Sequence, residues 1–216
     1  MKVSILDKII AAVTPPESEA DRAQARSRAL EYTDRAPWLG MVIDHHRQID
    51  DAFAAVKAAA DPANRKARLK TLAGLLTAHA VAEEGVIYPA LSDTGDTGHA
   101  TMAYTEQSAA KMQLGLLDRL DLMSADFEDK LGHLEGAVKH HVYQEEGTWF
   151  IDLAEGAVDS DHETIARRYA EEFDRYLSGP GGQSSPAASV TAASNATNTG
   201  SQALHGSVID QSDPPA

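Results

Sequence analysis

The sequence predicts an all-α protein whose central part is an up-down bundle of four long helices. Between Trp38 and Leu177 the apolar residues recur at steps of three and four, the spacing of one buried helix face. Three breaks rich in turn-forming residues divide this region into helices, at 61–62, 92–98 and 124–126. In addition, the segment HAVAEEG at 79–85 returns as HVYQEEG at 141–147. This internal repeat indicates that two helices of the bundle share a local design.

Polar residues interrupt the apolar stripes of three of these helices. The first stripe is Leu39, Val42, His46, Ile49, Phe53 and Val56. The second is Leu69, Leu72, Leu76, His79, Glu83 and Val86, and that of the fourth helix is Phe127, Leu131, Leu134, Val138, His141 and Glu145. A charged group in a bundle core needs a partner, because removing the partner of a buried charge costs about 3–5 kcal/mol. The five polar residues on these stripes are therefore expected to share one.

A metal ion is the partner that this spacing favours. His and Glu four residues apart lie one turn apart on one helix face, with about 5–6 Å between their Cβ atoms, so both can reach one ion. One such pair alone would most often be a core hydrogen bond. Two copies together with His46 favour a metal, since a merely structural duplication would have kept the apolar residues at least as well as the polar ones. The sequence has no cysteine, which leaves His, Asp, Glu and Tyr as ligands.

Other polar residues near the motifs are expected to lie outside the site. Glu84 and Glu146 fall about 100° around the helix from the stripes, which favours a supporting or solvated role. Tyr88 follows the first motif where Phe150 follows the second. The remaining histidines of the helical region are predicted to be flanking or surface residues: His45, His99, His133, His140 and His162.

His46, His79-x-x-x-Glu83 and His141-x-x-x-Glu145 together resemble the motifs of the hemerythrin-like, or HHE cation-binding, family. The resemblance covers about 38–177 and implies a hemerythrin-type four-helix bundle with a non-haem di-iron centre in its core. It also implies two iron ions, Fe2+ or Fe3+, that share an oxo or hydroxo bridge. The two glutamates would bridge the ions and the histidines would complete each ion.

The third helix departs from the family pattern, which has a histidine there. The apolar register argues for Gln107 at this position, and the spacing of the repeat, counted from His46, argues for Ser108. Glu106 offers the carboxylate oxygen that iron accepts readily, and we predict it as the sixth ligand. The predicted metal site is His46, His79, Glu83, Glu106, His141 and Glu145. Counting donors leaves about two positions for water, which favours oxidation, peroxide chemistry or iron handling over reversible O2 carriage.

The leading functional hypothesis is a cytoplasmic di-iron protein that reacts with O2, peroxide or nitric oxide in sensing, iron handling or detoxification. A di-iron enzyme that decomposes peroxide or oxidises ferrous iron is an alternative that uses the same residues. A metal-free helical interaction module is a second alternative. Manganese and zinc also suit imidazole and carboxylate ligands, so the metal is left open.

Composition and the chain ends complete the predictions. Thirty-three acidic and 19 basic residues give a formal charge of −14, which disfavours nucleic acid and anionic membranes as partners. No segment approaches the ~20 apolar residues of a spanning helix, and no export signal is recognisable, which favours the cytoplasm. Residues 1–37 are predicted to form a helical lead-in, with a short amphipathic helix at its start. Residues 178–216, poor in charged and aromatic residues, are predicted to be a disordered tail.

Overall fold

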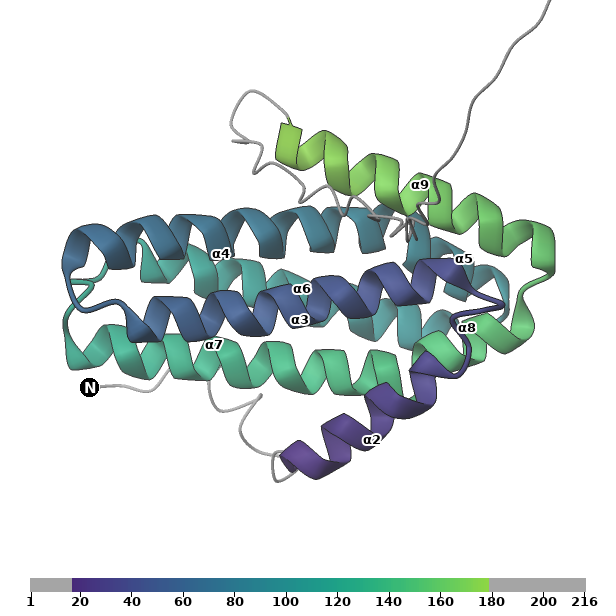
Figure 1. Ribbon diagram of the computed structural model, residues 1–216, viewed down its shortest axis with the longest axis horizontal. Coiled ribbons are helices and arrows are strands. Elements are labelled where there is room, and N and C mark those ends of the chain that lie inside the picture. The colour runs from purple at the N-terminus through teal and green to yellow at the C-terminus, as the bar shows by residue number, and fades with distance from the viewer. Residues whose placement is uncertain (1–16, 179–216) are drawn as a thin grey trace, which may run out of the picture. The chain divides into compact units, whose positions relative to one another are not determined.

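The computed structural model describes residues 17–178, and every regular element in this part of the chain is helical (Figure 1). Four long helices lie side by side: α3 (Pro37–Ala58), α4 (Pro62–Ala82), α6 (Thr97–Leu117) and α7 (Ala125–Gln144). The predicted all-α bundle is confirmed. The amphipathic helix expected within 1–16 and the tail expected beyond Ser178 lie outside the described residues. Among 17–178, no helix combines the length and apolar character needed to cross a bilayer.

The predicted breaks between helices are the N-terminal caps of the next ones. Asp61 caps α4, because its side chain accepts a hydrogen bond from the backbone N–H of Asn64 at 2.9 Å. Ser124 caps α7 in the same way by accepting from Phe127 at 3.2 Å. Such side chains satisfy backbone donors that have no partner within the helix. The polar residues at these breaks therefore fix where two of the bundle helices begin.

Both copies of the sequence repeat contain a π-helical turn, which the sequence analysis did not anticipate. α4 continues into η1 (Glu83–Ile87) and α5 (Tyr88–Asp93), and α7 continues into η2 (Glu145–Trp149) and α8 (Phe150–Gly156). Each π turn begins at the first glutamate of its motif. Single π turns inside α-helices are rare and often occur at functional sites. The sequence repeat is thus also a repeat of an unusual backbone geometry.

Two further helices flank the bundle. α2 (Glu19–Leu30) packs against η2 and buries Ala25 and Ala29. α9 (Asp159–Ser178) packs against α3 and α4 and buries a face that includes Tyr169 and Phe173 (Figure 1). Burying apolar side chains against the bundle stabilises both helices.

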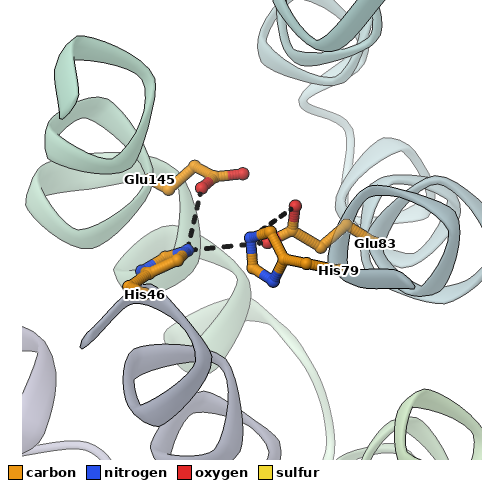
Figure 2. Close-up of side chains that lie close together, drawn as sticks. All are labelled: His46, His79, Glu83 and Glu145. Atoms are coloured by element: carbon orange, nitrogen blue, oxygen red, sulfur yellow. Dashed lines mark ion pairs between the residues drawn. The ribbon is translucent and has the colours of Figure 1, made fainter. Parts of the chain in front are cut away.

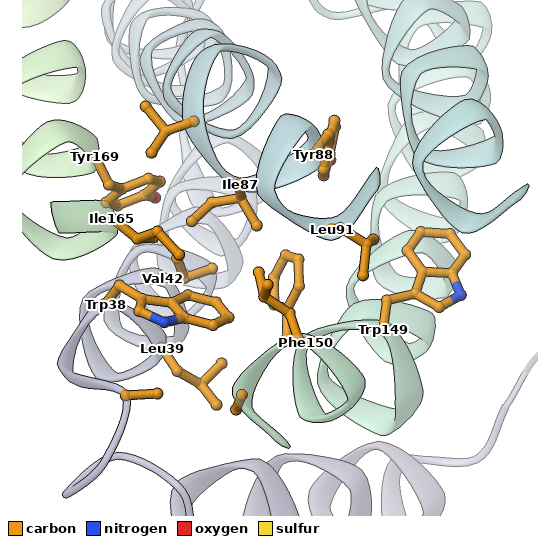
Figure 3. Close-up of a cluster of buried hydrophobic side chains, with 14 of the residues drawn as sticks. Trp38, Leu39, Val42, Ile87, Tyr88, Leu91, Trp149, Phe150, Ile165 and Tyr169 are labelled. Atoms are coloured by element: carbon orange, nitrogen blue, oxygen red, sulfur yellow. The ribbon is translucent and has the colours of Figure 1, made fainter. Parts of the chain in front are cut away.

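The core consists of two apolar clusters with a polar layer between them. One cluster contains Trp38, Tyr88, Trp149 and Phe150 (Figure 3) and also Ile43, among others. The other contains Ile49, Phe53, Leu72, Phe127 and Val142, among others. Along α3, Ile43 belongs to the first cluster and Ile49 to the second, with His46 between them. The polar residues predicted on the stripes therefore lie in the interior, in a layer that apolar packing closes from both ends of the bundle.

The burial pattern confirms the predicted stripes and contradicts the prediction made for one histidine. Every residue of the first and fourth stripes is buried, as are those of the second except the half-buried Leu76. The prediction that His162 is a surface residue is wrong, because its exposed fraction is 1%. The indole Nε1–H of Trp38 donates to His162 Nδ1 at 3.1 Å. α9 brings His162 onto the bundle, a contact between positions too far apart in the chain for helical periodicity to indicate.

Arg65 stabilises the end of the bundle at which α3 connects to α4 and α6 connects to α7. This arginine is only 6% exposed and donates to the backbone oxygens of Ala59 at 3.0 Å and Leu122 at 2.9 Å. It also pairs with Glu128, and its guanidinium lies 5.7 Å from the centre of the Phe127 ring. One buried cation therefore links both connections.

Candidate metal centre

Four buried side chains from three helices meet in the polar layer: His46 of α3, His79 of α4, Glu83 of η1 and Glu145 of η2 (Figure 2). One nitrogen or oxygen from each lies within 4.8 Å of the corresponding atoms of the other three. His46 Nε2 is 3.4 Å from Glu145 Oε2 and 3.8 Å from Glu83 Oε1. His79 Nε2 is 3.2 Å from Glu83 Oε2. The structure thus brings together four of the six predicted ligands.

The inner atoms of this group have no hydrogen-bond partner within the described residues. They are His46 Nε2, His79 Nε2, Glu83 Oε1 and Glu145 Oε2, and all four are buried. A buried polar atom without a partner costs about 1–3 kcal/mol, so four facing one another need a common explanation. A cation held among them would satisfy all four at once. Imidazole nitrogens and carboxylate oxygens suit iron, manganese and zinc, so the residues fit a metal of this kind.

The two carboxylates are each placed between two histidines. Glu145 directs Oε2 toward His46 and Oε1 toward His141, whose Nε2 lies 3.2 Å away. Glu83 directs Oε1 toward His46 and Oε2 toward His79. Different oxygens of one carboxylate can bind different ions. This arrangement is therefore compatible with a pair of ions, although His141 itself lies outside the group of four.

The outer nitrogen of each of the three histidines has a partner from another part of the chain. The pairs are His46 Nδ1 with Glu146 Oε1 at 2.8 Å, His141 Nδ1 with Glu106 Oε2 at 2.8 Å, and His79 Nδ1 with the Tyr169 hydroxyl at 3.1 Å. Contacts of this type orient a ligand imidazole. They also favour the tautomer that has its proton on the outer nitrogen and its lone pair on the nitrogen that faces the metal. Every histidine of the site thus turns Nε2 toward the centre.

On α6, the structure distinguishes the three residues considered for the third helix. Gln107 is 5% exposed, its Nε2 donates to Glu83 Oε2 at 2.5 Å, and its Oε1 is buried without a partner. Ser108 is exposed and donates to the backbone oxygen of Tyr104. Glu106 contacts the outer nitrogen of His141. Direct binding of a metal by Glu106 stays a prediction, whereas Gln107 is the α6 residue that contacts a carboxylate of the group.

The site also contains Tyr88, which the sequence analysis did not include. Its hydroxyl is buried and lies 2.8 Å from Glu145 Oε1, 3.1 Å from Glu83 Oε2 and 3.1 Å from His141 Nε2. The backbone N–H of Tyr88 closes the π turn on Glu83, so the wider turn places residue 88 over residue 83. The available signal was the repeat itself, because only the first copy has a hydroxyl where the second has Phe150.

In the metal-free site, burial and the neighbouring charges shift pKa values in opposite directions. Burial lowers the pKa of His79 well below its usual value, with the charge of His46 adding to the effect. Burial raises the pKa of Glu83 to about 7, and Glu145 contributes. Although burial opposes its charged form, contact with Glu145 and Glu106 raises the pKa of His141 to about 10. Burial also disfavours the Glu145 carboxylate, but His141 and His46 hold its pKa well below the usual range. A metal ion would therefore displace protons from this site.

Comparison with known proteins is in agreement with this geometry. Residues 39–151 match the family model described as the hemerythrin HHE cation binding domain. This match covers more than half of the chain, which therefore belongs to the hemerythrin HHE cation-binding family. The matched range runs from the first turn of α3 through η2 to the start of α8, whereas α2 and α9 lie outside it.

One relative has a name that refers to DNA and not to metal binding. A protein of Nostoc sp. (strain PCC 7120 / SAG 25.82 / UTEX 2576) named DNA nickase is 28% identical over 142 residues. The aligned region is 66% of this chain and 40% of the relative, so the chain spans less than half of that protein's length. No solved structure matches the chain.

Proposed function

We propose that the protein holds two non-haem iron ions, with an oxo or hydroxo bridge, in the polar layer of its bundle. It would react there with O2, peroxide or nitric oxide in sensing, iron handling or detoxification, in the cytoplasm. The observation that carries the proposal is the set of four buried atoms on His46, His79, Glu83 and Glu145 that face one another without a hydrogen-bond partner. The two-sided placement of both carboxylates supports a pair of ions over a single one.

In this proposal, His46, His79 and His141 supply imidazole nitrogens, and Glu83 and Glu145 supply carboxylate oxygens. Bound iron would provide Lewis-acid and one-electron chemistry toward small molecules. Glu106 would orient His141 through its outer nitrogen, and it is the sixth candidate ligand of the set.

Two neutral hydrogen-bond donors lie beside the carboxylates. The Tyr88 hydroxyl can donate to Glu145, and the Gln107 amide donates to Glu83. Burial, together with Glu145 and Glu83, raises the pKa of Tyr88 well above its usual value, which keeps the phenol protonated in the metal-free protein. Tyr88 therefore holds a proton at the centre of the site.

A small cavity beside the site is consistent with a small molecule as the reactant. It has a volume of about 40 Å³ and reaches His79, Gln107 and His141, with mostly apolar walls that include Leu114 and Val138. The cavity has room for water-sized molecules beside the two histidines. O2, nitric oxide and hydrogen peroxide are small enough to enter such a space.

Metal analysis of the purified protein tests the proposal. We expect about two irons per chain and absorption in the near ultraviolet and visible. His79→Ala and Glu145→Ala should each lower the bound metal, since either change removes a donor, whereas His133→Ala, at an exposed position on α7, should not. Metal content unchanged in both site variants would contradict the assignment. A wild-type protein that binds no metal would favour the interaction module.

Turnover of peroxide separates a binding protein from an enzyme that uses the same residues. A few water-occupied positions on the ions, as donor counting predicts, favour peroxide consumption. We expect the iron-loaded protein to consume peroxide over many cycles. A long-lived O2 adduct without peroxide consumption would instead indicate an oxygen carrier or sensor.

Nicking of DNA is a second candidate, raised by the name of the Nostoc relative. The formal charge of −14 disfavours it, because a DNA backbone would be repelled. The prediction that nucleic acid is not a partner is checked by incubating supercoiled plasmid with the metal-loaded protein. Relaxed circles that disappear with Glu145→Ala would establish nicking by this site and refute that prediction.

A further inference from the structure

The first flanking helix, α2, reaches the site through a chain of charged contacts. Arg26 Nε donates to both carboxylate oxygens of Glu146, each at 3.0 Å. Glu146 is 1% exposed, and its Oε1 lies 2.8 Å from His46 Nδ1. Arg26 belongs to a helix outside the range matched by the family model. The contact therefore connects a helix outside the matched range with a central histidine of the site.

The buried carboxylate of Glu146 needs a cation beside it. An unpaired charge in the interior costs several kcal/mol, and the charged contact with Arg26, whose Nε–H is shared between both carboxylate oxygens, offsets that cost. The carboxylate can then accept a hydrogen bond from the Nδ1–H of His46. With the proton on Nδ1, the lone pair of His46 is on Nε2, the atom that faces Glu145 and Glu83.

We propose that Arg26 is a positioning residue of the metal centre, acting on His46 through Glu146, and that α2 thereby completes the site. The inference rests on the proposed metal binding and assigns a role to a residue that touches no candidate ligand. His79 provides a contrast. Its outer nitrogen contacts the hydroxyl of Tyr169 at 3.1 Å, and that hydroxyl also contacts His45 at 2.8 Å. Of these two histidines, His46 is the one whose outer nitrogen is linked to an arginine, through Glu146. Loss of Arg26 should therefore alter the binding of metal by His46.

α2 has other contacts that keep it in place when Arg26 is changed. Ala25 and Ala29 are fully buried, and the helix begins with a capping box formed by Ser18 and Asp21. Arg26→Ala is therefore expected to fold. Arg22, one turn earlier, contacts Glu17 and Glu19 instead of the site, which makes Arg22→Ala a matched control.

Titration of metal-stripped full-length protein with Co2+ alone tests the proposal, because the visible bands of Co2+ report its ligands and their geometry. Arg26→Ala should weaken Co2+ binding by about 10–100-fold, the usual range for losing such a partner, and shift the bands. Arg26→Lys should restore part of the affinity, since it keeps the positive charge but lacks the planar guanidinium group. Arg22→Ala should bind as the wild type does.

Glu146→Gln decides whether the effect passes through the carboxylate. In that background, Arg26→Ala should cause no further loss of Co2+ affinity, because the two residues act in series. An equal loss in both backgrounds would overturn the proposal. So would unchanged affinity and bands in Arg26→Ala, even with a lower melting temperature, since Arg26 would then be purely structural. A wild type that fails to bind Co2+ would refute the metal site itself, an outcome distinct from either of these.

Discussion

Replacing Tyr88 by phenylalanine tests whether its hydroxyl supports the two buried carboxylates. The substitution keeps the ring, and Phe150 occupies the equivalent position of the second repeat while fully buried. It removes the hydrogen bond donated to Glu145 at 2.8 Å. Hydrogen bonds to charged groups contribute about 1.5–3 kcal/mol. Glu145 keeps contacts with His141 at 3.2 Å and His46 at 3.4 Å, so the lower half of that range applies.

We therefore expect Tyr88→Phe to lower the free energy of unfolding of the metal-stripped protein by about 2 kcal/mol. For a protein of this size, that corresponds to a fall in melting temperature of about 4–8 °C. Urea denaturation followed by circular dichroism measures the free energy, and a thermal scan checks it. The change should appear in the denaturation midpoint and leave the slope with urea unaltered.

Tyr104→Phe is the matched control for this measurement. The Tyr104 ring packs against that of Tyr88, with 5.1 Å between ring centres, but its hydroxyl donates to the backbone oxygen of Glu84 at a position 38% exposed. Its loss should cost less than about 1 kcal/mol. A Tyr88→Phe midpoint equal to that of wild type would refute the support assigned to the hydroxyl. Equal losses in the two variants would also refute it.

Three further predictions concern α6, α9 and the end of the bundle closed by Arg65. Gln107→His should change the visible spectrum of the iron-loaded protein, because Gln107 contacts Glu83, whereas Ser108→His, on the exposed face, should leave it unchanged. Burial lowers the pKa of His162, and the positive charge of Arg35 is the next largest cause. Below about pH 6.5 the folded state therefore binds fewer protons than the unfolded state, so the protein loses stability as the pH falls. His162→Gln should therefore lose less stability than wild type between pH 7 and pH 5 in urea denaturation. Arg65→Ala should cost about 2–4 kcal/mol in the same assay, because it leaves the buried carbonyl of Ala59 and the partly buried carbonyl of Leu122 without this donor, and a loss below 1 kcal/mol would contradict the role assigned to it.

The sequence alone determined the bundle and the helices that carry the candidate site. Helical periodicity depends only on local spacing, so a histidine or glutamate on an apolar stripe had to face the interior. His46, His79, Glu83 and Glu145 were placed by this reasoning, and they lie together in the structure. That they bind iron remains a prediction.

On α6, two neighbouring residues, Glu106 and Gln107, were both candidates for the position that faces the site. Adjacent residues on a helix point about 100° apart, and the apolar register favoured Gln107 while ligand chemistry favoured Glu106. The register identified the side chain that contacts Glu83. Glu106 lies further around the helix, at the edge of the buried face, where it meets the outer nitrogen of His141. Only the packing of α6 against α7 could show this.

The tertiary structure also decided which residues surround the histidines. Tyr88 reaches the carboxylates because a π turn shifts it over Glu83, a backbone change that a repeat of three and four residues does not encode. Arg26 and Tyr169 approach from α2 and α9. Their partners are many turns away in the chain, so no local pattern relates them. The sequence determined what faces inward on each helix, and the folding of distant helices onto one another determined what each inward group meets.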